Sequence, residues 1–150
     1  MTRLPATVAA AGLAAALLTA AAPQQLDGWE GRSWQAYSSI AMAITGDITT
    51  TPTAIVFGNG ASLAVQAVQQ GVPGLWGFES APGPATVLQV VPPANPVLLE
   101  GNTLCGMQPT YITLAVVADG SLAMTVYGGS AVPTSSQSDD VCAIYYYGPM

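Results

Sequence analysis

The sequence contains no histidine and no lysine, and its only basic residues are Arg3 and Arg32. Charged residues make up 7% of the chain, against about 25% in an average globular protein. Nucleic-acid binding depends on lysine and arginine side chains that displace counterions, so this class of function is excluded. A histidine metal site and a Ser-His-Asp or Cys-His catalytic group are excluded too, because each needs an imidazole.

Serine and threonine hydroxyls are frequent, but no histidine or lysine is present to act as their base. A hydroxyl without a base is a poor nucleophile, so we expect no enzyme activity and no cofactor. Two alternatives use carboxylates. Asp47 with Glu30 or Glu100 could form a glycosidase-like acid–base pair. Asp139-Asp140 could bind calcium, but there is no Asp-x-Asp-x-Asp-Gly spacing, which favours a solvated loop and no metal site.

Residues 1–22 have the three-part pattern of a secretory signal peptide. Arg3 precedes an apolar run rich in alanine and leucine, and the run ends in the small residues Ala20-Ala21-Ala22. A permanent membrane anchor is the alternative, but the run is shorter than the ~20 residues that a spanning helix needs. We therefore predict export to the periplasm or the extracellular space, with cleavage after Ala21 favoured over cleavage after Ala22.

The rest of the chain divides into a segment at 23–39 that leads into the fold and a β-domain at 40–150. Without the signal peptide, eight acidic residues face Arg32 alone, which gives a net charge of −7. Cys105 and Cys142 are the only cysteines. An even pair in an exported protein indicates a structural disulfide, since redox-active pairs favour Cys-x-x-Cys spacing and a nearby cation.

Alternation of apolar and polar residues predicts an all-β domain of seven or eight short strands. The clearest hairpin joins residues 111–118 to 121–127 through Asp119-Gly120. No segment after residue 38 has helical spacing, while residues 29–38 could hold one helical turn or a first strand. Gly58-Asn59-Gly60 is expected to form a tight turn. The other expected strands are 40–48, 53–57, 62–69, 86–91 and 141–147, with a short apolar segment at 97–99.

Short strands joined by tight turns favour antiparallel pairing, because parallel strands need long crossover connections. Closure into a small up-and-down barrel of about eight strands removes the free edges of the sheet. This barrel, preceded by the signal-peptide helix, is the predicted fold. A two-sheet β-sandwich is the alternative.

The chain resembles small exported β-barrels in its glycine- and tryptophan-rich start, its meander of strands and its late disulfide. Lipocalin-like proteins open the first strand with Gly-x-Trp, and Gly28-Trp29 and Gly31-Arg32-Ser33-Trp34 each differ from that spacing by one residue. Gly128-Gly129-Ser130 is similar to the Ser/Gly-rich loop of periplasmic lysozyme-inhibitor barrels. Residues 44–48 and 101–106 look like signatures of small uncharacterised exported bacterial proteins. The resemblance implies a barrel and, from the inhibitor family, a lysozyme-type partner.

Aromatic residues supply the candidate binding surface, because tyrosine and tryptophan dominate protein interfaces. Packing into the core is the alternative for these residues. Tyr145 and Tyr147 lie on one face of the last strand and Tyr146 on the other, so at least one tyrosine should be exposed. Asp47 could pair with Arg32. The candidate surface comprises Trp29, Trp34, Tyr37, Trp76, Phe78, Tyr145 and Tyr147.

Three functions fit these observations. The leading hypothesis is a non-catalytic binding protein whose acidic surface attracts a cationic protein partner, such as a lysozyme-type enzyme. The first alternative is a carrier that holds a small apolar ligand inside the barrel, which needs a cavity of roughly 300 Å³ or more. The second alternative is a structural cell-envelope protein, with a transmembrane β-barrel as a variant.

Overall fold

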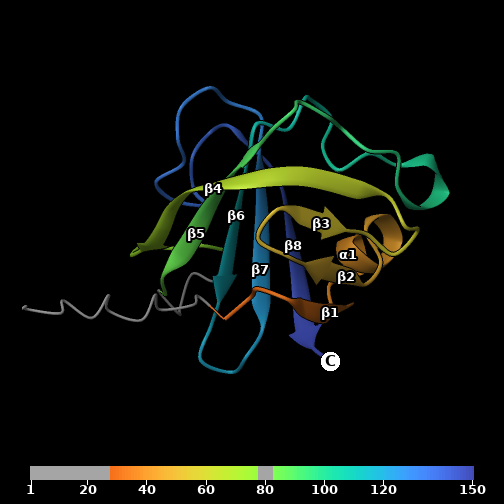
Figure 1. Ribbon diagram of the computed structural model, residues 1–150, viewed down its shortest axis with the longest axis horizontal. Coiled ribbons are helices and arrows are strands. Elements are labelled where there is room, and N and C mark those ends of the chain that lie inside the picture. Colours follow the sequence, from red (N-terminus) through yellow and green to blue (C-terminus); the bar gives the residue numbers. More distant parts are fainter. Residues whose placement is uncertain (1–27, 78–82) are drawn as a thin grey trace, which may run out of the picture.

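The computed structural model describes residues 28–77 and 83–150, which form a closed barrel of eight antiparallel strands (Figure 1). Each strand pairs with the next, and the last strand, β8 (Val141–Pro149), pairs with the first, β1 (Arg32–Ala36). The predicted up-and-down barrel is therefore confirmed, and the sandwich alternative is wrong. The predicted signal peptide lies outside the described residues.

The hairpin predicted around Asp119-Gly120 is confirmed, and so is the tight turn at Gly60, which has a φ of +85°. Most predicted strands fall within a few residues of the observed ones. The elements between β1 and β8 are α1 (Ser39–Ile44), β2 (Ile48–Thr50), β3 (Ala54–Val56), β4 (Ser62–Val72), β5 (Ala85–Val90), the 3-10 turn η1 (Leu99–Gly101), β6 (Tyr111–Val116) and β7 (Leu122–Tyr127).

The strand predicted at 40–48 is wrong over most of its length, where the chain forms the helix α1. Ser38 caps this helix, because its side chain accepts a hydrogen bond from the backbone N–H of Ala41. Ala41 and Ile44 are three residues apart, so they share one helical face, and both pack on the barrel core. Gly46 follows with a φ of +61°, and the strand β2 begins two residues later.

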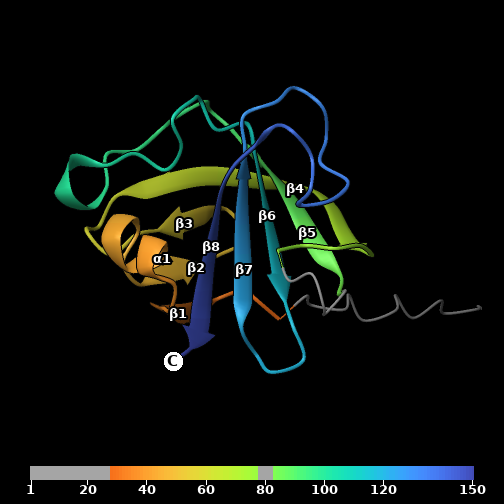
Figure 2. The same ribbon diagram turned by 180° about the vertical axis from the view of Figure 1, so that it is seen from behind.

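The barrel begins before residue 40, because β1 lies in the segment predicted to lead into the fold. Of the two structures expected for residues 29–38, the strand is the one found over Arg32–Ala36. β1 pairs on one side with β2 and on the other with β8. Figure 2 shows α1 beside β8, and the two elements are in contact. The short strands β1, β2 and β3 and the helix α1 thus form one end of the molecule.

Two tryptophans fill part of the barrel interior, and one threonine hydroxyl joins their polar groups. The indole N–H of Trp34 donates to Thr50 Oγ1 at 3.0 Å, and that hydroxyl lies 2.5 Å from the carbonyl oxygen of Trp29, to which it donates. The indole N–H of Trp29 donates to Thr86 Oγ1 at 2.9 Å. Because these groups cannot reach water, each bond offsets a desolvation penalty.

Loops cover the outer face of β5, β6 and β7, so these strands are buried on both sides. Trp76, in the loop after β4, packs on an outer cluster that includes Val87 and Tyr127. Ser136, in the loop before β8, joins the two loops: its N–H donates to Leu75 O at 2.9 Å, and its hydroxyl accepts from the N–H of Gly77 at 2.6 Å. Every residue of β7 is buried as a result.

The predicted disulfide between Cys105 and Cys142 is confirmed. It joins the long connection between β5 and β6 to the start of β8. The same connection is held by the hydroxyl of Tyr145, which donates to Leu104 O at 2.7 Å. Asn95 adds a bond from its amide to Cys105 O at 2.8 Å. A segment with little regular structure is thereby fixed over the barrel core.

Replacing Thr50 with valine tests the bridge between the tryptophans. The change removes the hydroxyl but keeps the shape, and it leaves the Trp34 indole N–H without its acceptor. Urea unfolding should show a loss of about 2–4 kcal/mol, because unsatisfied buried groups cost about 1–3 kcal/mol each. Thr49→Val is the matched control, since the Thr49 hydroxyl bonds the exposed Ser33 hydroxyl and should cost less than about 0.5 kcal/mol. Equal losses in both variants would contradict the bridge.

The Cys105→Ala/Cys142→Ala double variant tests the disulfide. The bridge spans a sequence separation of 37 residues, so its loss should lower the free energy of unfolding by about 4 kcal/mol on the loop-entropy estimate. Thermal unfolding followed by circular dichroism measures the change. A reducing agent should lower the Tm of the wild-type chain toward that of the variant and leave the variant unchanged. A variant that melts with the oxidised wild type would contradict this role.

Candidate functional site

Most of the predicted aromatic surface is buried, so this prediction is wrong for five of its seven residues. The barrel interior and the outer loops need bulky side chains, and these residues fill that space. Tyr37 is the member that the described residues leave exposed, at 78%. Phe78 lies outside the described residues. The buried members are Trp29, Trp34, Trp76, Tyr145 and Tyr147, each at most 2% exposed.

The three consecutive tyrosines of β8 alternate as the strand period requires. Tyr145 and Tyr147 point into the barrel, and Tyr146 lies on the outer face, where it is half-buried. The Tyr147 hydroxyl shares a 2.7 Å hydrogen bond with that of Thr45, which lies just after α1. The Tyr146 hydroxyl donates to Gly77 O. The predicted alternation is confirmed, but the expectation that at least one of these tyrosines is exposed is wrong, because the loop around Gly77 covers part of Tyr146.

The predicted ion pair between Arg32 and Asp47 is wrong, because each charged group has another partner. The Arg32 guanidinium donates to Gly28 O at 2.9 Å and lies 4.4 Å from the ring centroid of Trp34. Asp47 Oδ1 accepts the backbone N–H of Ala36 at 2.8 Å. Both residues therefore stabilise the backbone around β1 and the start of β2.

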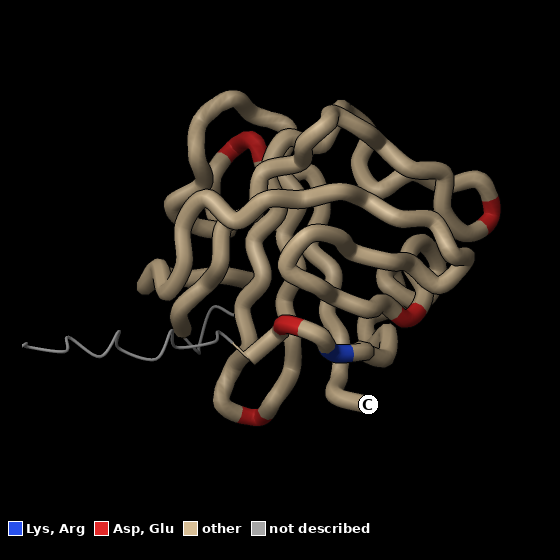
Figure 3. The backbone as a smooth tube through the Cα atoms, viewed as in Figure 1, with Lys and Arg blue, Asp and Glu red and all other residues tan. Residues whose placement is uncertain are grey.

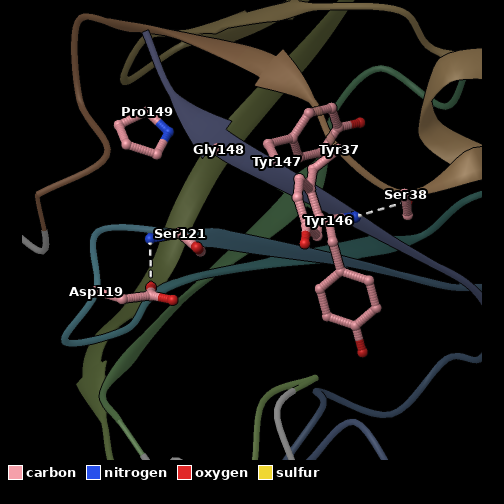
Figure 4. Close-up of a pocket in the computed structure, with 8 residues that line it drawn as sticks. All are labelled: Tyr37, Ser38, Asp119, Ser121, Tyr146, Tyr147, Gly148 and Pro149. Atoms are coloured by element: carbon pink, nitrogen blue, oxygen red, sulfur yellow. Dashed lines mark hydrogen bonds between the residues drawn. The ribbon is translucent and has the colours of Figure 1, made fainter.

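A groove runs beside the C-terminal half of β8, and we call it the β8 groove. Figure 4 shows Tyr37 and Ser38 on one side of the strand and the turn between β6 and β7 on the other. Its volume is about 630 Å³. The lining residues are Tyr37, Ser38, Asp119, Ser121, Tyr146, Tyr147, Gly148 and Pro149.

Backbone hydrogen bonds fix the wall of the β8 groove that follows β1. The N–H groups of Tyr37 and Ser38 both donate to Tyr146 O, at 3.0 and 3.2 Å. In return the N–H of Tyr146 donates to Ser38 Oγ at 3.3 Å. The exposed Tyr37 ring is therefore carried by a backbone that is anchored to the groove floor.

The opposite wall of the β8 groove is the β6–β7 turn. Asp119 Oδ1 accepts the backbone N–H of Ser121 at 2.8 Å. This backbone bond, with a second bond from the Ser121 hydroxyl, lowers the pKa of Asp119, so the carboxylate is ionised at neutral pH. Gly120 allows the turn through its φ of +86°, and a Cβ there would lie 3.8 Å from the ring of Pro149. The β6–β7 turn, which carries the Asp119 carboxylate, thus lies close to the end of β8.

A second hollow, of about 410 Å³, lies near α1. Gln35, Asp47 and Leu99 contribute to its lining. Its one charged group is the Asp47 carboxylate, which accepts the Ala36 N–H.

The acidic residues lie at separate places along the described backbone, apart from the adjacent Asp139 and Asp140 (Figure 3). Residues 28–77 and 83–150 contain no group of three histidine, cysteine, aspartate or glutamate side chains that could hold a metal ion. Within the same residues, no helix has the length and apolar character to cross a membrane. The arrangement offers hydrogen-bond acceptors and aromatic faces for recognition.

Sequence reasoning missed Asp119, Ser121 and Tyr146 as site residues. The hairpin prediction already placed Asp119-Gly120 in a turn. Antiparallel pairing of the next two strands puts that turn beside the end of the last strand. The order of strands around the barrel was therefore the signal that could have found this groove.

Buried tyrosines predict a stability loss at high pH. Burial raises the pKa of Tyr127 and Tyr145 to about 12, and that of Tyr147 further, against about 10 in the unfolded chain. The folded state holds these protons more tightly than the unfolded chain does. The tyrosines' contribution to the free energy of unfolding is therefore complete below pH ~10, and it is lost as the pH rises toward and beyond ~12. Urea unfolding at a series of pH values measures this loss.

The absence of lysine makes this titration simple to interpret, because tyrosines dominate the side-chain ionisation in this range. A Tyr145→Phe variant should lose less stability between pH ~10 and ~12 than the wild type. An equal loss in the two proteins would contradict the assignment of Tyr145.

Comparisons with protein-family models, with curated proteins and with solved structures give no significant match to this chain.

Proposed function

We propose that this chain is an exported, non-catalytic binding protein that recognises a cationic protein partner, with a lysozyme-type enzyme as the candidate. The proposal rests on the sign of the exposed charge. Asp47, Glu100, Asp119 and Asp139 are exposed in the described residues, and Glu30 and Asp140 are partly exposed. Against these six carboxylates the described residues offer one guanidinium, that of Arg32.

The Arg32 guanidinium weakens this negative surface little, because its one positive charge stands against six carboxylates in the described residues. A surface of one sign attracts an oppositely charged protein over a distance and raises the association rate. It also repels acidic proteins. Charge of this kind therefore selects a basic partner before any close contact forms.

Packing of the barrel interior favours recognition at the outer surface over transport of a small ligand. A cavity large enough for a ligand would expose the side chains around it to a water-sized sphere. Leu63, Leu88, Ile112 and Met124 point into the barrel from four strands, and each is 0% exposed. This close packing supports a protein partner over the carrier alternative.

Binding to a lysozyme-type enzyme as a function of salt tests the proposal. The chain purified from the exported fraction of its host should bind immobilised enzyme and reduce its lytic activity. The association rate should fall at least about tenfold between ~20 mM and ~500 mM NaCl, because salt screens the attraction. Biolayer interferometry measures the rates.

A basic protein of another fold, immobilised at the same density, separates specific recognition from charge attraction. Tighter binding to the lysozyme-type enzyme supports the named partner. Equal binding to both basic proteins would contradict lysozyme recognition, and an affinity for neither, at any salt concentration, would overturn the proposal of a cationic partner.

A further inference from the structure

The β8 groove combines an ionised carboxylate with an exposed aromatic ring. Asp119 supplies the carboxylate from the β6–β7 turn, and Tyr37 supplies the ring from the segment after β1. The described residues that line the groove include no cationic side chain. A negative group and an aromatic face in one groove are complementary to a positive, partly apolar side chain.

We propose that the β8 groove binds an arginine side chain presented by the protein partner. This proposal rests on the proposed function and names the contact that the partner makes. Arginine fits better than lysine, because its planar guanidinium can stack on a tyrosine ring while its fork of N–H groups donates to a carboxylate. Its long apolar stem suits a groove lined by Gly148 and Pro149.

The Asp119 carboxylate retains acceptor capacity for such a ligand. A carboxylate has two oxygens with about four lone-pair positions. The Ser121 N–H occupies a position on Oδ1, and the Ser121 hydroxyl donates one further bond. The remaining positions are available to an incoming guanidinium. The two Ser121 bonds also hold the carboxylate in place, which lowers the entropy lost on binding.

The remainder of the groove is also built before a ligand arrives. Tyr146 O holds the backbone of both Tyr37 and Ser38, and the ring of Tyr146 is tied through its hydroxyl to Gly77 O. Residues 37, 119 and 146 belong to three separate parts of the sequence. The closed barrel brings them together, so the groove is a property of the folded state.

The size of the groove agrees with this occupant. Its volume of about 630 Å³ falls within the roughly 300–1,000 Å³ of ligand sites in proteins. One arginine side chain leaves room for neighbouring residues of the partner backbone. The groove is therefore suited to a side chain that projects from a protein surface.

NMR spectroscopy with N-acetyl-arginine amide tests the site without any protein partner. The ¹⁵N-labelled chain, purified from the exported fraction of its host, should show shifts confined to the amides of Asp119, Ser121, Tyr37 and Tyr146. The neutral isostere N-acetyl-citrulline amide should cause much smaller shifts. Equal shifts with the two amides, or shifts spread over the whole surface, would overturn the proposal.

Two pairs of variants define the contacts. Asp119→Asn keeps an acceptor for the Ser121 N–H but removes the charge, and it should weaken arginine amide binding about three- to fivefold. Asp139→Asn, which removes an exposed charge outside the groove, should leave binding unchanged. Tyr37→Ala should weaken binding about two- to fivefold, whereas Tyr37→Phe keeps the ring and should bind like the wild type.

The same variants separate this proposal from the proposed function. A lysozyme-type enzyme that binds the wild type and Asp119→Asn equally well would overturn the groove as the contact and leave the cationic partner standing. Arginine amide shifts in the groove without binding to the enzyme would support the arginine site and contradict the named partner.

Discussion

The Thr50 hydroxyl between Trp29 and Trp34 is the interaction on which the barrel interior depends. Wide indole rings fill a small barrel efficiently, but each brings an N–H that cannot reach water there. Thr50 accepts the bond from one tryptophan and donates to the backbone of the other. This pairing lets the interior be both aromatic and free of charge. The strands can then close tightly around it.

Much of the fold was predictable from local patterns. The Asp119-Gly120 turn between two segments of strand-forming residues identified the β6–β7 hairpin, and the two cysteines identified their bridge. The segment 40–44 could not be assigned in this way, because its alternating isoleucine, alanine and methionine also place Ala41 and Ile44 on one helical face. The cap at Ser38 and the packing of Ala41 and Ile44 on the core stabilise the helix over the strand.

The candidate site was less predictable than the fold. The aromatic residues that composition singles out are the ones that a short chain uses to fill its core, so Trp34 and Tyr147 are fully buried. Tyr37 is exposed because it lies between β1 and α1, one residue beyond the last residue of β1 that pairs with β8. Its neighbours in the groove come from distant parts of the sequence. Their proximity follows from strand order around the barrel, which no local pattern contains.

The pairing of β1 with β8 determines when the barrel can close. The last residue pair of this ladder joins Trp34 to Pro149, so the barrel cannot close until residue 149 has been synthesised. Until then β1 has β2 as its only ladder partner in the described barrel. Pairs of consecutive strands can form earlier, but the barrel closes only when β8 is complete and pairs with β1.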